Sequence, residues 1–154
     1  MDGLAAHLVV DEALAWLTGE RGDRDPDRPF CLFVWFHEPH EPIDTTDPYE
    51  SLYKDEDISA VARQYYGDIS HMDAAVGRLM RHLENTGAAD DSFVFFTSDN
   101  GPEYRTKRTK PGSAAPLRGK KGHTYEGGIR VPGIVRFPRC AASRSGATSR
   151  STGR

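Results

Sequence analysis

The sequence predicts an α/β fold with a mostly parallel sheet flanked by helices, and three observations support this prediction. The runs 30–36 and 92–97 are almost continuously apolar, which is typical of strands buried on both faces of a parallel sheet. A long amphipathic helix is predicted between these two runs. Helical and strand-like segments therefore alternate along the chain, as they do in proteins built on parallel sheets.

The first predicted elements are a helix and a buried strand. From about Leu4 to Thr18, apolar residues recur at spacings of three and four positions, and Gly19 supplies a stop signal. A polar linker, 20–29, leads into the first strand, Phe30–Phe36.

The longest helix is expected over about 28 residues ending near Gly87. Its apolar stripe is formed by Ile58, Val61, Tyr65, Ile69, Met72, Val76, Leu79 and Leu83. We expect this stripe to pack on the sheet, because burial of such side chains contributes about 1.5–3 kcal/mol each. After the second strand, Ser92–Thr97, the basic segment 102–118 is expected to form a long loop, and a third strand is expected over Ile134–Phe137.

Composition excludes several classes of protein. The 154 residues include 20 Lys and Arg against 23 Asp and Glu, a net charge of -3, so no overall basic field attracts nucleic acid. No run of about 18 apolar residues predicts a transmembrane helix, and no signal-peptide pattern is visible. Two cysteines, Cys31 and Cys140, are too few for a disulfide framework, and Cys31 is expected in the core. The Ser- and Arg-rich end of the chain, 139–154, is expected to be a disordered tail.

Three polar loops lie beside the predicted strands. The loop 37–42 follows the first strand and the loop 98–101 follows the second, and α/β proteins bind ligands at such carboxyl ends. A third loop, 121–128, precedes the last strand. Each loop alone is weak evidence, since Asp-Asn-Gly is common in turns and a loop with two histidines is often a surface turn.

Taken together and in this order, these segments resemble the sulfatase family of the alkaline-phosphatase-like superfamily. The matching segments are Pro29-Phe30, Pro39-His40-Glu41-Pro42, Tyr66 with Met72-Asp73 and Val76-Gly77, Phe95–Gly101, Pro116–Gly119 with Lys121-Gly122, and Tyr125–Pro132. The Ser-Asp-Asn-Gly and Glu-Gly-Gly-x-Arg-x-Pro motifs at this separation are the most specific part. The resemblance implies an incomplete alkaline-phosphatase-like fold, with residues 1–138 as a partial sulfatase catalytic domain.

The resemblance also implies roles for four residues. Asp99 and Asn100 match two of the family's calcium ligands, and their side-chain oxygens suit a hard cation. His40 matches the histidine that contacts the sulfate ester and can protonate the leaving oxygen. Lys121 matches the lysine that binds a sulfate oxygen and offsets negative charge in the transition state. We expect these four side chains to converge at one edge of the sheet.

Two parts of the family pattern have no counterpart in this chain. The family's nucleophile is a formylglycine made from the cysteine of a Cys-x-Pro-Ser-Arg motif, whereas the segment that begins at Cys140 has alanine in place of the proline. The acidic pair that completes the calcium site is also missing from the sequence. The chain thus resembles the second part of a sulfatase catalytic domain.

The function implied by the resemblance is a calcium-dependent, arylsulfatase-like sulfuric ester hydrolase. Its substrate would be a small-molecule or carbohydrate sulfate ester. The alternatives are a phosphate mono- or diester hydrolase of the same superfamily, or an inactive truncated fragment. The family is mostly periplasmic, extracellular or lysosomal, and the sequence assigns this chain to none of these compartments.

Overall fold

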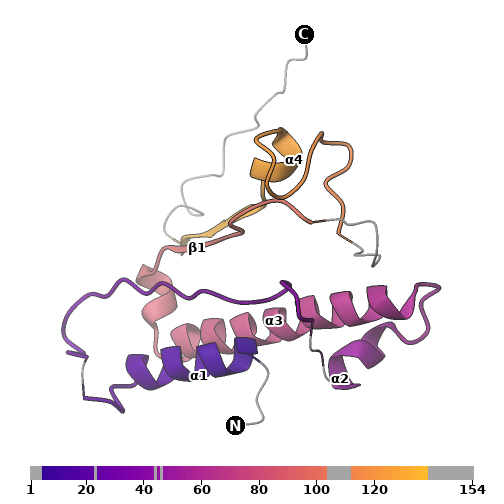
Figure 1. Cartoon of the computed structure of the whole chain (residues 1–154). Helices are drawn as coiled ribbons and strands as arrows, with labels where there is room; N and C mark the ends of the chain where they lie inside the picture. The colour runs from indigo at the N-terminus through magenta and orange to yellow at the C-terminus, as the bar shows by residue number, and fades with distance from the viewer. Residues whose placement is uncertain (1–4, 23, 44, 46, 104–111, 139–154) are drawn as a thin grey trace.

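The computed structural model describes residues 5–22, 24–43, 45, 47–103 and 112–138. The predicted tail, 139–154, and the middle of the basic loop lie outside these residues. The described elements are α1 (Ala5–Leu17), α2 (Asp47–Glu50), η1 (Ser51–Tyr53), α3 (Ala60–Asn85), η2 (Ala88–Asp91), β1 (Val94–Thr97), α4 (Glu126–Ile129) and β2 (Gly133–Arg136). Helices α1, α2 and α3 form one layer, and an extended segment runs along it on the side that faces β1 (Figure 1).

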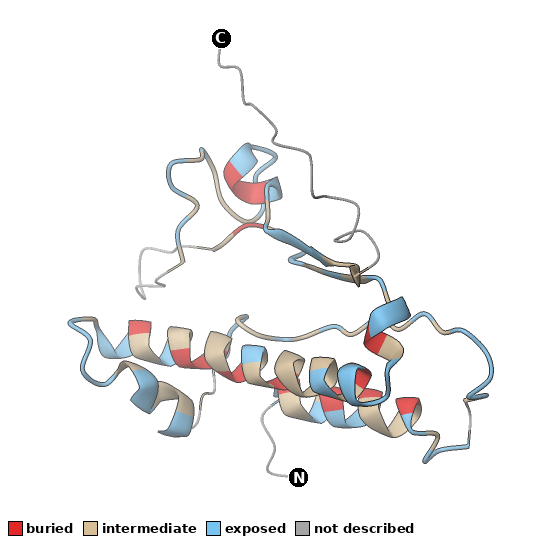
Figure 2. Ribbon diagram, turned by 180° about the vertical axis from the view of Figure 1, so that it is seen from behind, coloured by how far each residue is buried: buried red, intermediate tan, exposed pale blue. Residues whose placement is uncertain are grey.

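The two predicted helices are confirmed, and they pack against each other. The Ser59 side chain caps α3 by accepting a hydrogen bond from the Ala62 backbone N–H at 3.2 Å. The α1–α3 interface contains three completely buried side chains: Ala6, Val10 and Ala75. Figure 2 shows the buried residues gathered along these two helices. Larger, partly buried side chains, Leu14, Met72 and Leu79, pack around these three residues.

The most buried face of α3 differs from the predicted apolar stripe. Ile69 and Met72, which belong to that stripe, are half-buried, whereas Asp68, His71 and Ala75 are buried. Ala75 packs against α1, and the His7 ring of α1 stacks on His71. Asp68 lies beside Glu38 of the loop 37–42. Two polar side chains therefore lie where periodicity alone would place apolar ones.

The predicted parallel sheet is not confirmed. The described sheet consists of β1 and β2 in antiparallel pairing, with Val94 opposite Arg136 and Thr97 opposite Gly133. The segment 30–36 is extended, but it forms no strand with any described residue. The predicted second and third strands thus exist, and the first has only the extended conformation expected of a strand.

The segment 30–36 has one covered face and one exposed face. Its even-numbered residues are half-buried against the helices, and Phe36 packs on the α1–α3 core. The opposite face carries Phe33 and Trp35, which are 76% and 83% exposed. Cys31 lies on this exposed face, so the prediction that it belongs to the core is wrong. Within the part of the chain that the structure describes, no helix is long and apolar enough to cross a membrane.

Candidate functional site

Two of the three motif loops are joined by backbone hydrogen bonds. The Gly101 N–H donates to the Gly128 carbonyl at 2.9 Å, and the Lys121 N–H donates to the Pro102 carbonyl at 3.1 Å. A third bond, from the Gly127 N–H to the Arg118 carbonyl at 2.7 Å, closes the second loop on itself. The Ser-Asp-Asn-Gly and Glu-Gly-Gly motifs are therefore held side by side, although they are far apart in the sequence.

The glycines of these motifs are required by the closeness of the two backbones. A Cβ atom at Gly101 would overlap the carbonyl oxygen of Gly127, and one at Gly128 would overlap that of His123. A Cβ atom at Gly127 would overlap the carbonyl oxygen of Gly119. Carbonyl groups of the backbone cannot move aside as a flexible side chain can. We call this set of contacts between residues 101–102 and 118–128 the glycine contact.

Asp99 and Asn100 lie between β1 and the glycine contact. The Ser98 hydroxyl donates to the Asn100 carbonyl at 3.0 Å, which fixes the turn after the strand. The Asp99 side chain is exposed and the Asn100 side chain is half-buried. Among the described residues, neither side chain has a hydrogen-bond or ion-pair partner, so both can bind a ligand.

The donor chemistry at this turn fits the calcium ion that the family resemblance implies. Calcium prefers carboxylate and amide oxygens, and it takes about six to eight of them. Asp99 and Asn100 provide oxygens of both kinds on adjacent residues. They account for only a part of a calcium shell, so the remaining oxygens must come from other groups or water.

Lys121 belongs to the same cluster of loops. Its backbone is fixed by the bond to Pro102, and its side chain is half-buried with no ion-pair partner among the described residues. Nearby, the Arg118 guanidinium lies over the Tyr125 ring at 3.9 Å from the ring centroid. The bond to Pro102 thus places the Lys121 backbone two residues from Asn100 in the neighbouring loop, and the approach of its ammonium group to the Asp99–Asn100 turn stays a prediction.

His40 lies in the remaining motif loop. Its Nδ1–H donates to the Glu41 carbonyl at 2.7 Å, and its backbone N–H donates to the His37 carbonyl at 3.0 Å. Because Nδ1 faces a carbonyl oxygen, Nε2 is the nitrogen left for a substrate. No contact between described residues joins His40 to Asp99 or Lys121, so their convergence stays a prediction.

Sequence reasoning missed a buried polar cluster formed by Glu38, Asp68 and His71. The three residues each offer a metal-ligating atom, and these atoms lie within 4.8 Å of one another. The signal was present in part, since Asp68 and His71 are three residues apart and share one face of a helix. Glu38 comes from the loop of His40, and only the tertiary structure brings it to α3.

The electrostatics of this cluster are set by burial. Asp68 is 3% exposed and His71 is completely buried. Burial lowers the pKa of His71; Glu38 opposes this change, and His7 adds to it. The imidazole of His71 is therefore neutral near pH 7.

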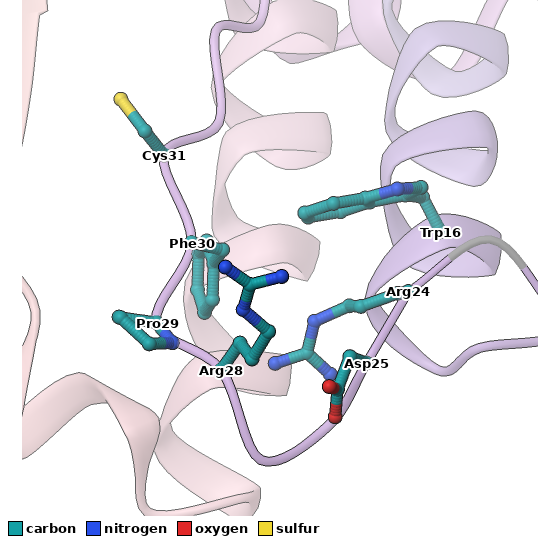
Figure 3. A pocket seen from close by; sticks show the side chains of 7 residues that line it. All are labelled: Trp16, Arg24, Asp25, Arg28, Pro29, Phe30 and Cys31. Carbon is teal, nitrogen blue, oxygen red and sulfur yellow. The ribbon is translucent and has the colours of Figure 1, made fainter.

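The pocket at the end of α1 is separate from all of these residues. It has a volume of about 340 Å³, and of the motif residues only Pro29 and Phe30 line it (Figure 3). Arg24 fills part of it, donates to the Leu17 carbonyl at 2.9 Å, and lies over the rings of Trp16 and Phe30. This arginine closes the C-terminal end of α1, so the pocket is explained by the packing of the fold.

The chain is similar in sequence to a known protein family. Residues 3–152 match the Sulfatase family model. The chain is 35% identical over 148 residues to human Arylsulfatase A, and the aligned region covers 88% of this chain and 27% of that protein. It is 34% identical over 133 residues to the Arylsulfatase of Hemicentrotus pulcherrimus, and the aligned region covers 85% of this chain and 21% of that protein.

A solved structure shares the fold. The crystal structure of Ps i-CgsB in complex with k-i-k-neocarrahexaose superposes with a TM-score of 0.72 at 26% identity, over 87% of this chain and 28% of that chain. The chain thus spans roughly a quarter of the length of the proteins it matches. With a family model that matches almost every residue, the chain belongs to the sulfatase family.

Proposed function

We propose that this chain forms part of the metal and sulfate site of an arylsulfatase-like sulfuric ester hydrolase. The observation that carries the proposal is the glycine contact, which holds the Asp99–Asn100 turn beside the backbone of Lys121. A sulfate ester needs positive charge close to its oxygens as negative charge develops in the transition state. A metal-ligating turn held beside a lysine supplies both parts of such a site.

Each motif residue has a distinct task in this proposal. Asp99 and Asn100 bind the calcium ion, which when bound polarises the sulfate group. Lys121 pairs with a sulfate oxygen as a point charge. The Nδ1–H of His40 donates to the Glu41 carbonyl. His40 therefore acts through Nε2, as the general acid for the leaving oxygen.

The substrate class follows from the relatives. The proteins named above are arylsulfatases, and the solved structure contains k-i-k-neocarrahexaose. We therefore propose a small-molecule or carbohydrate sulfate ester as the substrate. The family's formylglycine nucleophile would act on a sulfate group held by these residues, and the Cys-x-Pro-Ser-Arg motif that encodes it is not in this sequence.

Calcium binding tests the proposal directly. Backbone amide shifts of the 154-residue chain are recorded by NMR during titration with calcium chloride, for the unchanged chain and for Asp99→Asn. We expect calcium to shift the amides of residues 98–101, and Asp99→Asn to weaken the affinity at least about tenfold, since a charged ligand oxygen is lost. Asp90→Asn removes the same charge from an exposed site outside the turn and serves as the matched control. Equal affinities of Asp99→Asn and Asp90→Asn would refute the proposed site.

Sulfate binding gives a second test. In the presence of calcium, titration with sodium sulfate should shift the amides of residues 118–122. Lys121→Ala should abolish this shift, whereas Lys120→Ala, one residue away with the same charge change, should preserve it. Titration with phosphate in parallel tests the other ester class, and a clear preference for phosphate would favour a phosphate ester hydrolase.

A further inference from the structure

We propose that Glu38, Asp68 and His71 form a second metal site, for a zinc-type divalent cation, buried between α1, α3 and the loop of His40. This site is separate from the calcium ligands of the proposed function and does not depend on them. It uses one imidazole and two carboxylates, whereas the calcium ligands at Asp99 and Asn100 offer oxygen only.

The first argument is geometric. Ligands around a zinc ion at about 2.1 Å lie roughly 3.4 Å from one another. Glu38 Oε1 and His71 Nδ1 are already 3.7 Å apart, and the atoms offered by all three residues lie within 4.8 Å of one another. Small side-chain rotations would bring the three atoms to metal-binding distances.

The second argument is the state of the buried polar atoms. His71 has no exposed surface, and neither of its ring nitrogens has a hydrogen-bond partner among the described residues. The Glu38 side chain is 4% exposed, and its Oε2 is equally without a partner. Buried polar groups in folded proteins are almost always paired, so an imidazole and a carboxylate facing each other in this state point to a ligand between them.

The surroundings of the cluster hold these ligands in place. Glu38 Oε1 accepts a hydrogen bond from the Ala6 N–H at 2.8 Å, in the first turn of α1. This bond orients the Glu38 carboxylate, as hydrogen bonds to metal-ligating carboxylates commonly do. The His7 ring stacks on His71 at 4.9 Å between centroids, and the Tyr49 ring lies at 5.3 Å.

His7 belongs to the wall of the site and is not a ligand. Arg78 donates to His7 Nδ1 at 2.8 Å, so the ring hydrogen sits on Nε2 and is donated to the Tyr49 hydroxyl at 3.0 Å. Both nitrogens of His7 are therefore occupied. The His7 ring covers one face of the His71 ring, whereas a metal ion would bind a ring nitrogen at the edge of that ring.

The donor set selects the class of cation. A mixed nitrogen and carboxylate set suits zinc and other first-row transition metals, whereas calcium and magnesium prefer oxygen alone. A bound ion would tie α3 to the loop that carries His40, which lies two residues after Glu38.

The test measures zinc binding by isothermal titration calorimetry on the 154-residue chain after removal of metals with EDTA. We expect one tight site, and an affinity at least about tenfold lower in Glu38→Gln and in His71→Asn, each of which removes one ligand. Glu38→Gln retains the oxygen that accepts the Ala6 N–H. His82→Asn changes another histidine of α3, outside the cluster, and should bind zinc as the unchanged chain does. Zinc affinity that is unchanged in both ligand variants, or no zinc binding at all, would overturn the proposal.

A spectrum of the unchanged chain keeps the test independent of how the variants fold. Cobalt replaces zinc in such sites and reports its coordination by visible absorption. We expect stoichiometric cobalt to produce intense bands of a four- or five-coordinate site, and zinc to abolish them by competition. A spectrum identical to that of the hydrated ion would overturn the proposal.

Discussion

A methyl group added at Gly101 tests the central feature of the candidate site. The Cβ of Gly101→Ala would overlap the carbonyl oxygen of Gly127, which belongs to the backbone of the opposite loop. The two loops can accept the methyl group only by moving apart. This movement breaks the bond from the Gly101 N–H to the Gly128 carbonyl.

The expected cost follows from two contributions. A lost buried hydrogen bond costs about 1 kcal/mol, and overpacking against a rigid neighbour costs about 1–3 kcal/mol. Gly101→Ala should therefore lower the free energy of unfolding by about 2–4 kcal/mol. Gly77→Ala is the matched control, because its Cβ meets only the end of the flexible Arg81 side chain at 3.2 Å. In the middle of α3 it should instead raise the free energy of unfolding by about 1 kcal/mol through helix propensity.

Urea unfolding followed by circular dichroism distinguishes the two variants. With a slope of about 1.5 kcal/mol per molar urea, a loss of 3 kcal/mol lowers the midpoint by about 2 M. Amide hydrogen exchange at Lys121 and Gly127 reports the glycine contact itself, and both amides should exchange faster in Gly101→Ala. A midpoint and exchange rates equal to those of the unchanged chain would show that the two backbones are not in the close contact described here.

Four further predictions concern the core, a helix cap, the titration of a buried ring and the sulfate-binding lysine. Val10→Ala should lower the free energy of unfolding by about 2 kcal/mol, because Val10 is completely buried between α1 and α3; a urea midpoint equal to that of the unchanged chain would contradict this packing. Ser59→Ala should lower the free energy of unfolding by about 1 kcal/mol, because α3 loses its N-terminal cap. Ser59→Asp keeps a capping oxygen and should have a free energy of unfolding close to that of the unchanged chain; urea unfolding measures both variants. With EDTA present, the folded chain should lose stability as the pH falls below about 6.5, since burial lowers the pKa of His71 and the unfolded chain then binds more protons; His71→Asn should flatten that dependence, and an unchanged slope would refute it. With calcium present, Lys121→Ala should weaken the affinity for sulfate at least about tenfold and Lys120→Ala less than about twofold, measured by isothermal titration calorimetry, and equal effects would remove Lys121 from the site.

The sequence allowed the helices to be predicted because their signals are local. Apolar spacing lies within α3 and Gly87 follows its end, and periodicity marks α1 in the same way. The second and third strands were predicted nearly to the residue, as β1 and β2. The motif loops were recognised from their residue types, but the glycine contact that explains two of the motifs was not, because it joins backbone atoms distant in sequence.

The buried cluster could not be predicted for a related reason. A search for apolar stripes assigns polar residues of a helix to its solvent face, whereas Asp68 and His71 are buried. Glu38 joins them from a loop that lies about 30 positions earlier in the chain. The Glu38 carboxylate is held there by the Ala6 N–H, which is 32 residues away in the sequence. Contacts of this kind depend on the tertiary arrangement and leave no periodic signal.

The difference between the predicted and observed sheet has a physical reason in the side chains of the extended segment. Phe33 and Trp35 are large apolar residues on a face that no described residue covers. Phe93, just before β1, and Phe95, within β1, are similarly exposed, at 63% and 57%. Aromatic side chains of this size stabilise a fold only when they are removed from water. The sequence of this segment is thus that of a strand covered on both faces, while the described residues cover one face. The chain spans roughly a quarter of the length of the curated relatives it matches, and a sheet larger than the two described strands stays a prediction from this sequence pattern.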